Sequence, residues 1–337
     1  MKRRIALRTA LLLLAAVALP RAALAQSCQA SNASVAFGNV DVVAGSQNYA
    51  ASYSAPTSNI TVTCNVGLLS LGSLKFSACI NLDGASGGAT RTIGGAGSPS
   101  YNLYSDAGHG TVWGATGSTP GPVSVSLAIT SVLLGATAST SVPIYGYMLS
   151  NLNNTVVPGT YNGGPNATVS YNYTYAVLGT PSNPPSCSAG PSGSNGSSSF
   201  SLAVSATVTH DCSVSATTIS FGGSVGVLTG AIPSTGTITA TCTSGDAYTL
   251  SLNKGTTSGA SLADRQMAGS GSAVVHYQLY TNSSHTTVWG DSTAGTATLG
   301  GNGTGNSQNY TVYGLVPQQS TPAPATYNDT VTVTVTY

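Results

Sequence analysis

Two histidines at matching positions are the first candidates for catalysis. His109 and His285 each precede a Thr-Val-Trp-Gly motif, with Asp106 and Asp291 nearby. A histidine between a serine and an aspartate is the arrangement of serine hydrolases, and serine is abundant here. However, no Gly-x-Ser-x-Gly motif lies between a strand and a helix, and the eight aspartates form no pair with glycosidase spacing. We therefore expect no enzyme, and expect both histidines to occupy turns beside packed tryptophans.

Metal and cofactor sites are also not expected. Asp83-Gly84 and the 302–305 segment have the composition of turns, and neither the EF-hand pattern nor a Gly/Asp nonapeptide repeat is present. The six cysteines contain no Cys-x-x-Cys motif and have no histidine cluster beside them.

The cysteines instead predict disulfides, and an internal repeat indicates how they pair. Cys28 to Phe37-Gly38 recurs with the same spacing as Cys212 to Phe221-Gly222, and the stretch 101–114 recurs as 277–290. Cys28–Cys64 and Cys212–Cys242 are therefore equivalent pairs, each joining the first two strands of a domain. Cys79 and Cys187 have no counterparts and are expected to pair with each other by elimination, the alternative being a free or metal-bound pair.

The repeat also predicts the domain organisation. Residues 1–25 have the basic start, apolar run and Ala-x-Ala site of a signal peptide. We expect a first domain at 26–209, with a linker at 178–198 and a last strand at 199–209, and a second domain at 210–337. Short alternating segments between Gly, Pro and Asn clusters, among them 34–43, 73–80, 168–177 and 218–227, predict an all-β fold of two immunoglobulin-like β-sandwiches.

Charge and the length of the apolar runs argue against nucleic-acid binding and against a membrane span. Removal of the signal peptide leaves four basic residues against eight aspartates, a net charge of −4 with no basic run. Nucleic acid is therefore not an expected partner, and no membrane span is expected after signal cleavage because no other apolar run approaches the required length.

The segment 199–209 and the end of the chain differ in one respect. The first alternates strictly, and its inward side chains are expected to close the sheet of the first domain: Phe200, Leu202, Val204, Ala206 and Val208. The end of the second domain alternates too, through Val331, Val333, Val335 and Tyr337, but no such strand follows it. An open sheet edge carries unpaired backbone groups, so we expect this edge to accept a strand from another protein.

Two loops of the first domain are more apolar than their counterparts in the second. Apolar residues grouped in exposed loops mark contact surfaces, although these leucines could equally turn inward and cap the sandwich. The candidate surface-binding residues are Leu68, Leu69, Leu71, Val132, Leu133 and Leu134.

These motifs resemble a known family. Tyr277-Gln278-Leu279-Tyr280, Thr287-Val288-Trp289-Gly290 and the ending 327–337 are similar to the spore coat U domain, which includes the pilins of archaic, Csu-type chaperone–usher pili. The resemblance covers both halves; the first half departs more, with longer loops and a Tyr-rich ending at 169–175.

The resemblance implies a two-domain tip adhesin of such a pilus, active in surface attachment and biofilm formation. A periplasmic chaperone and then an adjacent pilin subunit would each supply the missing strand of the second domain, with assembly through an outer-membrane usher. The chain would be exported through the periplasm to the cell surface, where it would contact a host or abiotic surface. Cleavage after Ala25 would leave two residues before Cys28 and hence no donor strand, so we expect a position at the pilus tip.

Two other functions fit the sequence. One is a structural coat or extracellular matrix protein, which the family name allows. The other is a secreted carbohydrate-binding module that stacks sugars on Tyr101, Tyr104, Trp113 and Tyr145.

Overall fold

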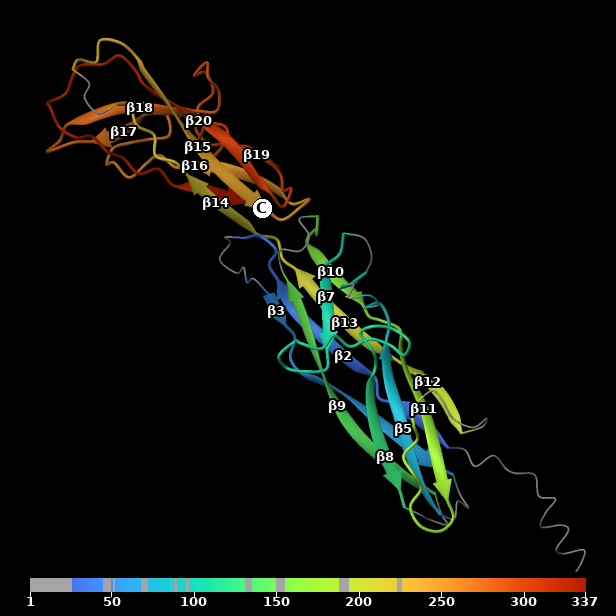
Figure 1. The fold of residues 1–337 in the computed structure, drawn as a ribbon. Coiled ribbons are helices and arrows are strands. Elements are labelled where there is room, and N and C mark those ends of the chain that lie inside the picture. The colour runs from blue at the N-terminus through green and yellow to red at the C-terminus, as the bar shows by residue number, and fades with distance from the viewer. Residues whose placement is uncertain are drawn as a thin grey trace, which may run out of the picture.

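The computed structural model describes residues 26–44, 50, 52–67, 72–85, 87, 90–94, 97–130, 135–149, 155–187, 194–222 and 226–337. Within this part of the chain every named element is a β-strand. The strands form two β-sandwich domains placed end to end (Figure 1). We refer to strands β1 to β13 as domain 1 and to strands β14 to β21 as domain 2.

Domain 1 contains three sheets. Their strand orders are β1-β4-β9-β7-β6, with β3 added beside β9, then β12-β11-β5-β8, and β10-β13-β2. The bounds are β1 Ser27–Ala30, β2 Ala33–Val40, β3 Ser52–Ser54, β4 Ser58–Val66, β5 Ser73–Leu82, β6 Arg91–Thr92, β7 Ser100–Tyr104, β8 Val123–Ile129, β9 Ala136–Leu149, β10 Gly159–Gly163, β11 Ala167–Ala176, β12 Asn195–Phe200 and β13 Leu202–Val208.

Domain 2 contains two sheets, with strand orders β14-β15-β20-β18-β17 and β19-β16-β21. The bounds are β14 Cys212–Ala216, β15 Ile232–Cys242, β16 Ala247–Leu252, β17 Arg265–Ala268, β18 Val274–Tyr280, β19 Leu299–Asn302, β20 Ser307–Val316 and β21 Val333–Thr336. The strands correspond to β1, β4, β5, β6, β7, β8, β9 and β11 of domain 1.

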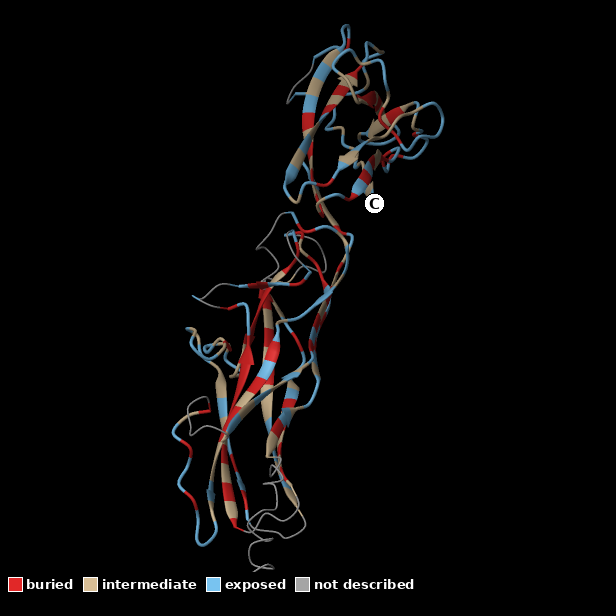
Figure 2. Ribbon diagram, turned by 90° about the vertical axis from the view of Figure 1, so that its right-hand side faces the viewer, coloured by how far each residue is buried: buried red, intermediate tan, exposed pale blue. Residues whose placement is uncertain are grey.

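Side-chain alternation explains the sandwich. Along β4 and β15 the residues alternate between buried and partly exposed, which a strand with one face on a core requires. Figure 2 shows the same alternation of buried and exposed segments along the strands of both domains. Each core contains one fully buried tryptophan, Trp113 in domain 1 and Trp289 in domain 2.

Three disulfides join the strands. Cys28–Cys64 links β1 to β4, and Cys212–Cys242 links β14 to β15, in both cases between directly paired residues. Cys79–Cys187 fixes the segment before β12 to the central strand β5. The first two are the equivalent pairs that the repeat predicts, and the third is the pair expected by elimination.

No helix in the described residues is long and apolar enough to cross a lipid bilayer. The proposed signal peptide, residues 1–25, lies outside this part of the chain.

Candidate functional site: an open groove in the second domain

The last strand of domain 1 shows what the groove of a complete domain contains. β13 runs antiparallel to β10 and parallel to β2, and so fills the space between them. Leu202, Val204, Ala206 and Val208 are buried along it, and Phe200, at the end of β12, is partly buried against the same core. Four of the five side chains expected to face inward therefore pack against the core of domain 1, and the fifth, Val208, is buried at the end of β13.

Both walls of this space have counterparts in domain 2. In domain 1, Val35 and Phe37 of β2 pack over Gly146, so closely that a Cβ there would lie 3.0 Å from the Phe37 ring. In domain 2, Phe221 packs over Gly314 in the same way, with a corresponding distance of 2.9 Å. The first wall, residues 217–221, is therefore in place without a strand beside it.

The second wall is formed by a tyrosine turn. Tyr161 donates a hydrogen bond to the carbonyl oxygen of Val157 at 2.8 Å, four residues earlier. Tyr327 donates to the carbonyl oxygen of Ala323 at 2.6 Å, also four residues earlier. The chain around Tyr327 thus follows the same local path as the chain that leads into β10.

Between these walls, domain 2 has an open groove of about 400 Å³. Apolar side chains of the core form its floor, among them Ile238, Leu252, Leu279 and Val312, and Val331 and Val333 lie along one side. Because the equivalent space in domain 1 holds β13, the groove has the position and lining of a site for one β-strand.

The open groove changes the burial and the secondary structure around it. Val35 and Phe37 are 1% and 7% exposed in domain 1, whereas their counterparts Ile219 and Phe221 are only partly buried. The prediction of a strand at 218–227 is wrong for the described residues, because 218–222 and 226–227 form none. The physical reason is that β2 takes its strand partner from β13, and domain 2 has no described strand in that place.

The predicted acceptor edge lies along this groove. β21 is the last strand of its sheet and pairs only with β16 among the described strands. Val331, Val333 and Val335 are partly buried against the core of domain 2, whereas Tyr337 is 50% exposed. The other edge of β21 is therefore where an added strand would pair.

A hydrogen-bonded carboxylate supports the second wall of the groove. Asp329 accepts hydrogen bonds from the Tyr277 hydroxyl at 2.6 Å and from the Thr256 amide at 2.9 Å. Burial alone would raise the pKa of Asp329, but these hydrogen bonds outweigh it and hold that pKa below its usual value. Burial, and then the bond to Asp329, raise the pKa of Tyr277. The carboxylate thus fixes the wall rather than offering a free charge to a ligand.

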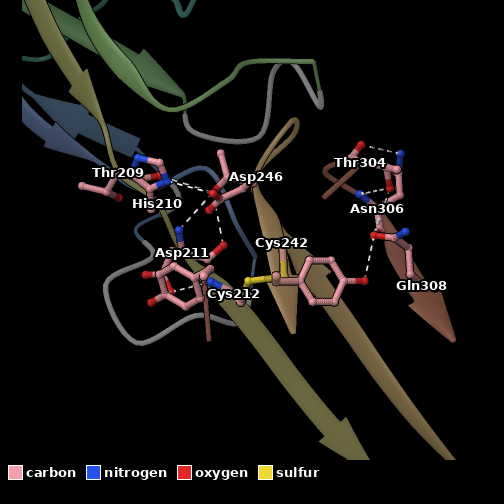
Figure 3. Close-up of a disulfide and its surroundings, with 12 residues drawn as sticks. Thr209, His210, Asp211, Cys212, Cys242, Asp246, Thr304, Asn306 and Gln308 are labelled. Atoms are coloured by element: carbon pink, nitrogen blue, oxygen red, sulfur yellow. Dashed lines mark hydrogen bonds and ion pairs between the residues drawn. A yellow bond between two sulfur atoms is a disulfide. The ribbon is translucent and has the colours of Figure 1, made fainter. Parts of the chain in front are cut away.

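The junction of the two domains lies beside the Cys212–Cys242 disulfide, at the start of β14 (Figure 3). Residues 209–211 join β13 to β14, and the Thr243 amide donates to the carbonyl oxygen of Asp211 at 3.0 Å. His210 Nδ1 lies 2.8 Å from Asp246 Oδ1. The Tyr337 hydroxyl donates to Asp211 Oδ1 at 3.3 Å, which ties the last residue of the acceptor edge to this segment.

Comparison with protein families gives a match to the Spore Coat Protein U domain over residues 13–168 and again over 198–334. The chain belongs to this family. Its members are structural or adhesive subunits and not enzymes. A comparison with curated proteins finds no match.

Among solved structures, two pilus proteins are similar to this spore coat U protein. One is the complex of the chaperone CsuC with the tip subunit CsuE from archaic chaperone–usher Csu pili of Acinetobacter baumannii, at 20% identity and TM-score 0.49, covering 92% of this chain and 100% of that one. The other is the CupB6 tip adhesin of Pseudomonas aeruginosa, at 12% identity and TM-score 0.36, covering 91% of this chain and 94% of that one.

The candidate surface-binding residues Leu68, Leu69, Leu71, Val132, Leu133 and Leu134 lie outside the described residues. The strands that flank them end together, because Ser73 pairs with Ala176 and Leu74 pairs with Ile129. This is the end of domain 1 far from domain 2, where β8 and β11 finish (Figure 1). Directly after β11, Val177 and Leu178 are 63% and 91% exposed.

Sequence reasoning missed these two exposed residues. The signal was present, because Val177-Leu178 precedes Gly179 just as apolar residues precede Gly72 and Gly135 in the other two loops. Alternation alone places Val177 at the end of the strand expected at 168–177 and Leu178 at the start of the expected linker.

The aromatic and histidine candidates have structural roles in this spore coat U fold. Trp113 Nε1 donates to the carbonyl oxygen of Ile80 at 2.8 Å, and Trp289 Nε1 to that of Leu250 at 3.0 Å. Trp113 and Tyr101 are 0% and 2% exposed, so neither can stack on a sugar. His109 and His285 both adopt positive φ angles in turns, 55° and 52°.

A buried arginine in each domain was also missed. Arg91 donates to the carbonyl oxygens of Leu82 and Trp113, and Arg265 to those of Leu252 and Trp289. Burial lowers the pKa of both guanidinium groups. They are two of only four basic residues after the signal peptide and lie at matching places in the repeat, which is a signal that the sequence does carry.

Proposed function

We propose that this chain is a two-domain subunit of a surface pilus, and that domain 2 is completed by a β-strand from another protein. The observation that carries the proposal is the groove of domain 2, whose walls match those around β13 while the space between them is open. Strand addition to a sheet edge is an established way for proteins to bind an extended peptide.

The physical need for such a strand is large. Fully burying one large apolar side chain contributes roughly 1.5–3 kcal/mol, and each backbone hydrogen bond adds about 1 kcal/mol net. A donor with five inward side chains would supply on the order of 10 kcal/mol, similar to the whole stability of an ordinary domain. Domain 2 without a donor is therefore expected to be much less stable than domain 1.

Two proteins would supply the missing strand, one after the other. A periplasmic chaperone would occupy the groove during export, and an adjacent pilin subunit would replace it during assembly at an outer-membrane usher. The complex of a chaperone with a tip subunit among the similar structures is consistent with such a partner. The proposed domain limits are 26–209 and 210–337, with residues 1–25 removed on export.

Adhesion is proposed for the opposite end of the molecule. Domain 1 closes its own groove with β13 and so has no need of a neighbour, which suits the last subunit of a fibre, at the pilus tip. The end far from domain 2 presents Val177 and Leu178, and the 67–72 and 130–135 loops start and end beside them. We propose that this end contacts host or abiotic surfaces and supports biofilm formation.

Hydrogen exchange of the full exported chain tests the central proposal. We expect amides of β21 and of residues 217–222 to exchange much faster than those of β13, and to become protected when a peptide copying residues 194–209 is added. The variant Val335→Asp, on the groove side, should lose this protection, whereas Thr334→Asp, on the exposed side, should keep it. Equal protection of both domains without peptide, and no change with it, would refute strand acceptance.

The family name favours one other function, that of a structural coat protein. Strand acceptance would then join subunits in a layer rather than in a fibre. Immunogold labelling with an antibody against domain 1 separates the two: label at fibre ends supports the tip subunit, and label spread over a coat supports the coat protein.

A further inference from the structure

The segment that closes domain 1 has two halves of different composition, the separate strands β12 and β13. The second half, β13, carries the large buried side chains described above. The first half, β12, reads Asn-Gly-Ser-Ser-Ser-Phe and lies against β11, with Gly196 directly opposite Tyr171.

Tyr171 explains why a glycine occupies that position. Its ring crosses the strand, so that a Cβ at residue 196 would lie 2.6 Å from the Tyr171 Cζ atom. Atoms of neighbouring residues do not approach so closely without displacement, and Tyr171 is only 8% exposed. The Tyr171 hydroxyl also donates to the carbonyl oxygen of Gln26 at 3.1 Å, which fixes the ring toward the start of β1.

Domain 2 repeats the tyrosine. Tyr337, directly after β21, stands two residues after Val335, as Tyr171 on β11 stands two residues after Val169. Val333 and Ala167 pair with equivalent residues of β16 and β5. The Tyr337 hydroxyl reaches Asp211, the residue before Cys212, just as Tyr171 reaches toward the residues before Cys28. The ring of Tyr337 therefore extends toward the start of β14, across the path of any strand that pairs with β21.

A second contact determines which side chain fits two residues after the glycine. Ser198 Oγ donates to the carbonyl oxygen of Cys28 at 2.9 Å, between β12 and β1. The equivalent acceptor in domain 2 is the carbonyl group of Cys212, at the start of β14. A small hydroxyl side chain two residues after the glycine satisfies that group without filling the space.

We infer, on the basis of the proposed function, that the strand accepted by domain 2 carries glycine opposite Tyr337 and a small hydroxyl residue two positions later. Large apolar side chains follow at four, six, eight and twelve positions after the glycine and a small one at ten, as in Phe200, Leu202, Val204, Val208 and Ala206. The strand runs antiparallel to β21, with its glycine end at the domain junction. Tyr337 thus fixes the register of the donor.

The test uses the full exported chain and four synthetic peptides. The parent peptide copies residues 194–209; one variant has valine at the Gly196 position, a matched control has valine at the exposed Ser197 position, and one has aspartate at the Val204 position. Binding is measured by calorimetry, and the register by hydrogen exchange of β21. We expect the valine substitution for glycine to weaken binding about tenfold or more, and the control to bind like the parent peptide.

A variant of the protein separates register from general fit. In Tyr337→Ala the obstructing ring is absent, so the penalty for valine at the glycine position should largely disappear, and the aspartate peptide should still fail. Equal binding of the glycine and valine peptides to the unaltered chain would overturn the inference and leave strand acceptance intact. Failure of every peptide, the parent included, would overturn strand acceptance itself.

Discussion

Truncation of Leu202 to alanine is the most direct test of what β13 does for domain 1. Leu202 is 4% exposed and lies where β13 passes between β10 and β2. Removing a buried leucine side chain to Cβ typically costs about 2–5 kcal/mol, from lost burial and from the cavity that remains. For a domain of this size, each kcal/mol lowers the melting temperature by about 2–4 °C.

The assay is thermal unfolding of the full chain with a donor peptide present, so that both domains are folded at the start. We expect Leu202→Ala to lower the domain 1 transition by roughly 5–15 °C and to leave the domain 2 transition unchanged. Ala203→Ser is the matched control, because Ala203 is exposed on the same strand, and it should shift neither transition noticeably. Hydrogen exchange of β2 and β10 amides assigns the transitions.

A loss of domain 1 stability below about 1 kcal/mol in Leu202→Ala would refute the view that β13 is an integral strand of domain 1. A shift confined to domain 2 would refute the assignment of β13 to domain 1. Either result would also remove the template from which the donor pattern of domain 2 was inferred.

Three further predictions concern other parts of the chain. Arg265→Met should destabilise domain 2 by on the order of 3 kcal/mol in denaturant unfolding, because the carbonyl groups that Arg265 holds lose a charged donor. Folding lowers the pKa of Asp329. The ionised carboxylate therefore stabilises domain 2 fully above the pKa that Asp329 has in the unfolded chain, about 4, and this stabilisation is lost as the pH falls through the pKa in the folded protein. Asp329→Asn should therefore be less stable than the parent at pH 7 and nearly equal to it at pH 2. Replacing Val177 and Leu178 with serine should reduce adherence of piliated cells to polystyrene without changing pilus number or domain 1 stability. The control Val227→Ser, at an exposed apolar residue of domain 2, should leave adherence and pilus number unchanged. Unchanged adherence of the Val177 and Leu178 variant would contradict the proposed contact end.

Much of the fold could be predicted because alternation reports directly on a buried face. The strands expected at 73–80 and 168–177 correspond to β5 and β11, which pair with each other over their full length. Disulfides were predictable for a different reason: the repeat placed equivalent cysteines in both halves. Such local and repeated signals need no knowledge of the third dimension.

The failures have a common physical cause, which is dependence on a neighbour. Residues 218–222 have the composition of β2 but form no strand, because backbone pairing there requires a second strand that the alternation of one segment cannot reveal. The short strands β17 and β19 were missed because each owes its conformation to a single partner, β18 and β16. The apolar end residues after β11 were missed because exposure depends on where strands stop, which sequence locates only to within a few residues.

The contrast between the two domains has a kinetic consequence that follows from chain connectivity. β13 is covalently attached to the domain it completes, so its local concentration near the space between β10 and β2 is in the millimolar range expected for a short linker. The Cys79–Cys187 disulfide shortens that linker further, because it anchors the middle of the linker to β5. Domain 1 can therefore close as soon as it leaves the export machinery. Under the proposed function, domain 2 has the same walls but obtains its strand by a bimolecular encounter, during which its groove and the β21 edge stay open to aggregation. The encounter rate rises with donor concentration, whereas aggregation rises with subunit concentration. We therefore expect the soluble yield of the full chain to depend on the ratio of donor to subunit. The soluble yield of a variant lacking domain 2 should not depend on that ratio.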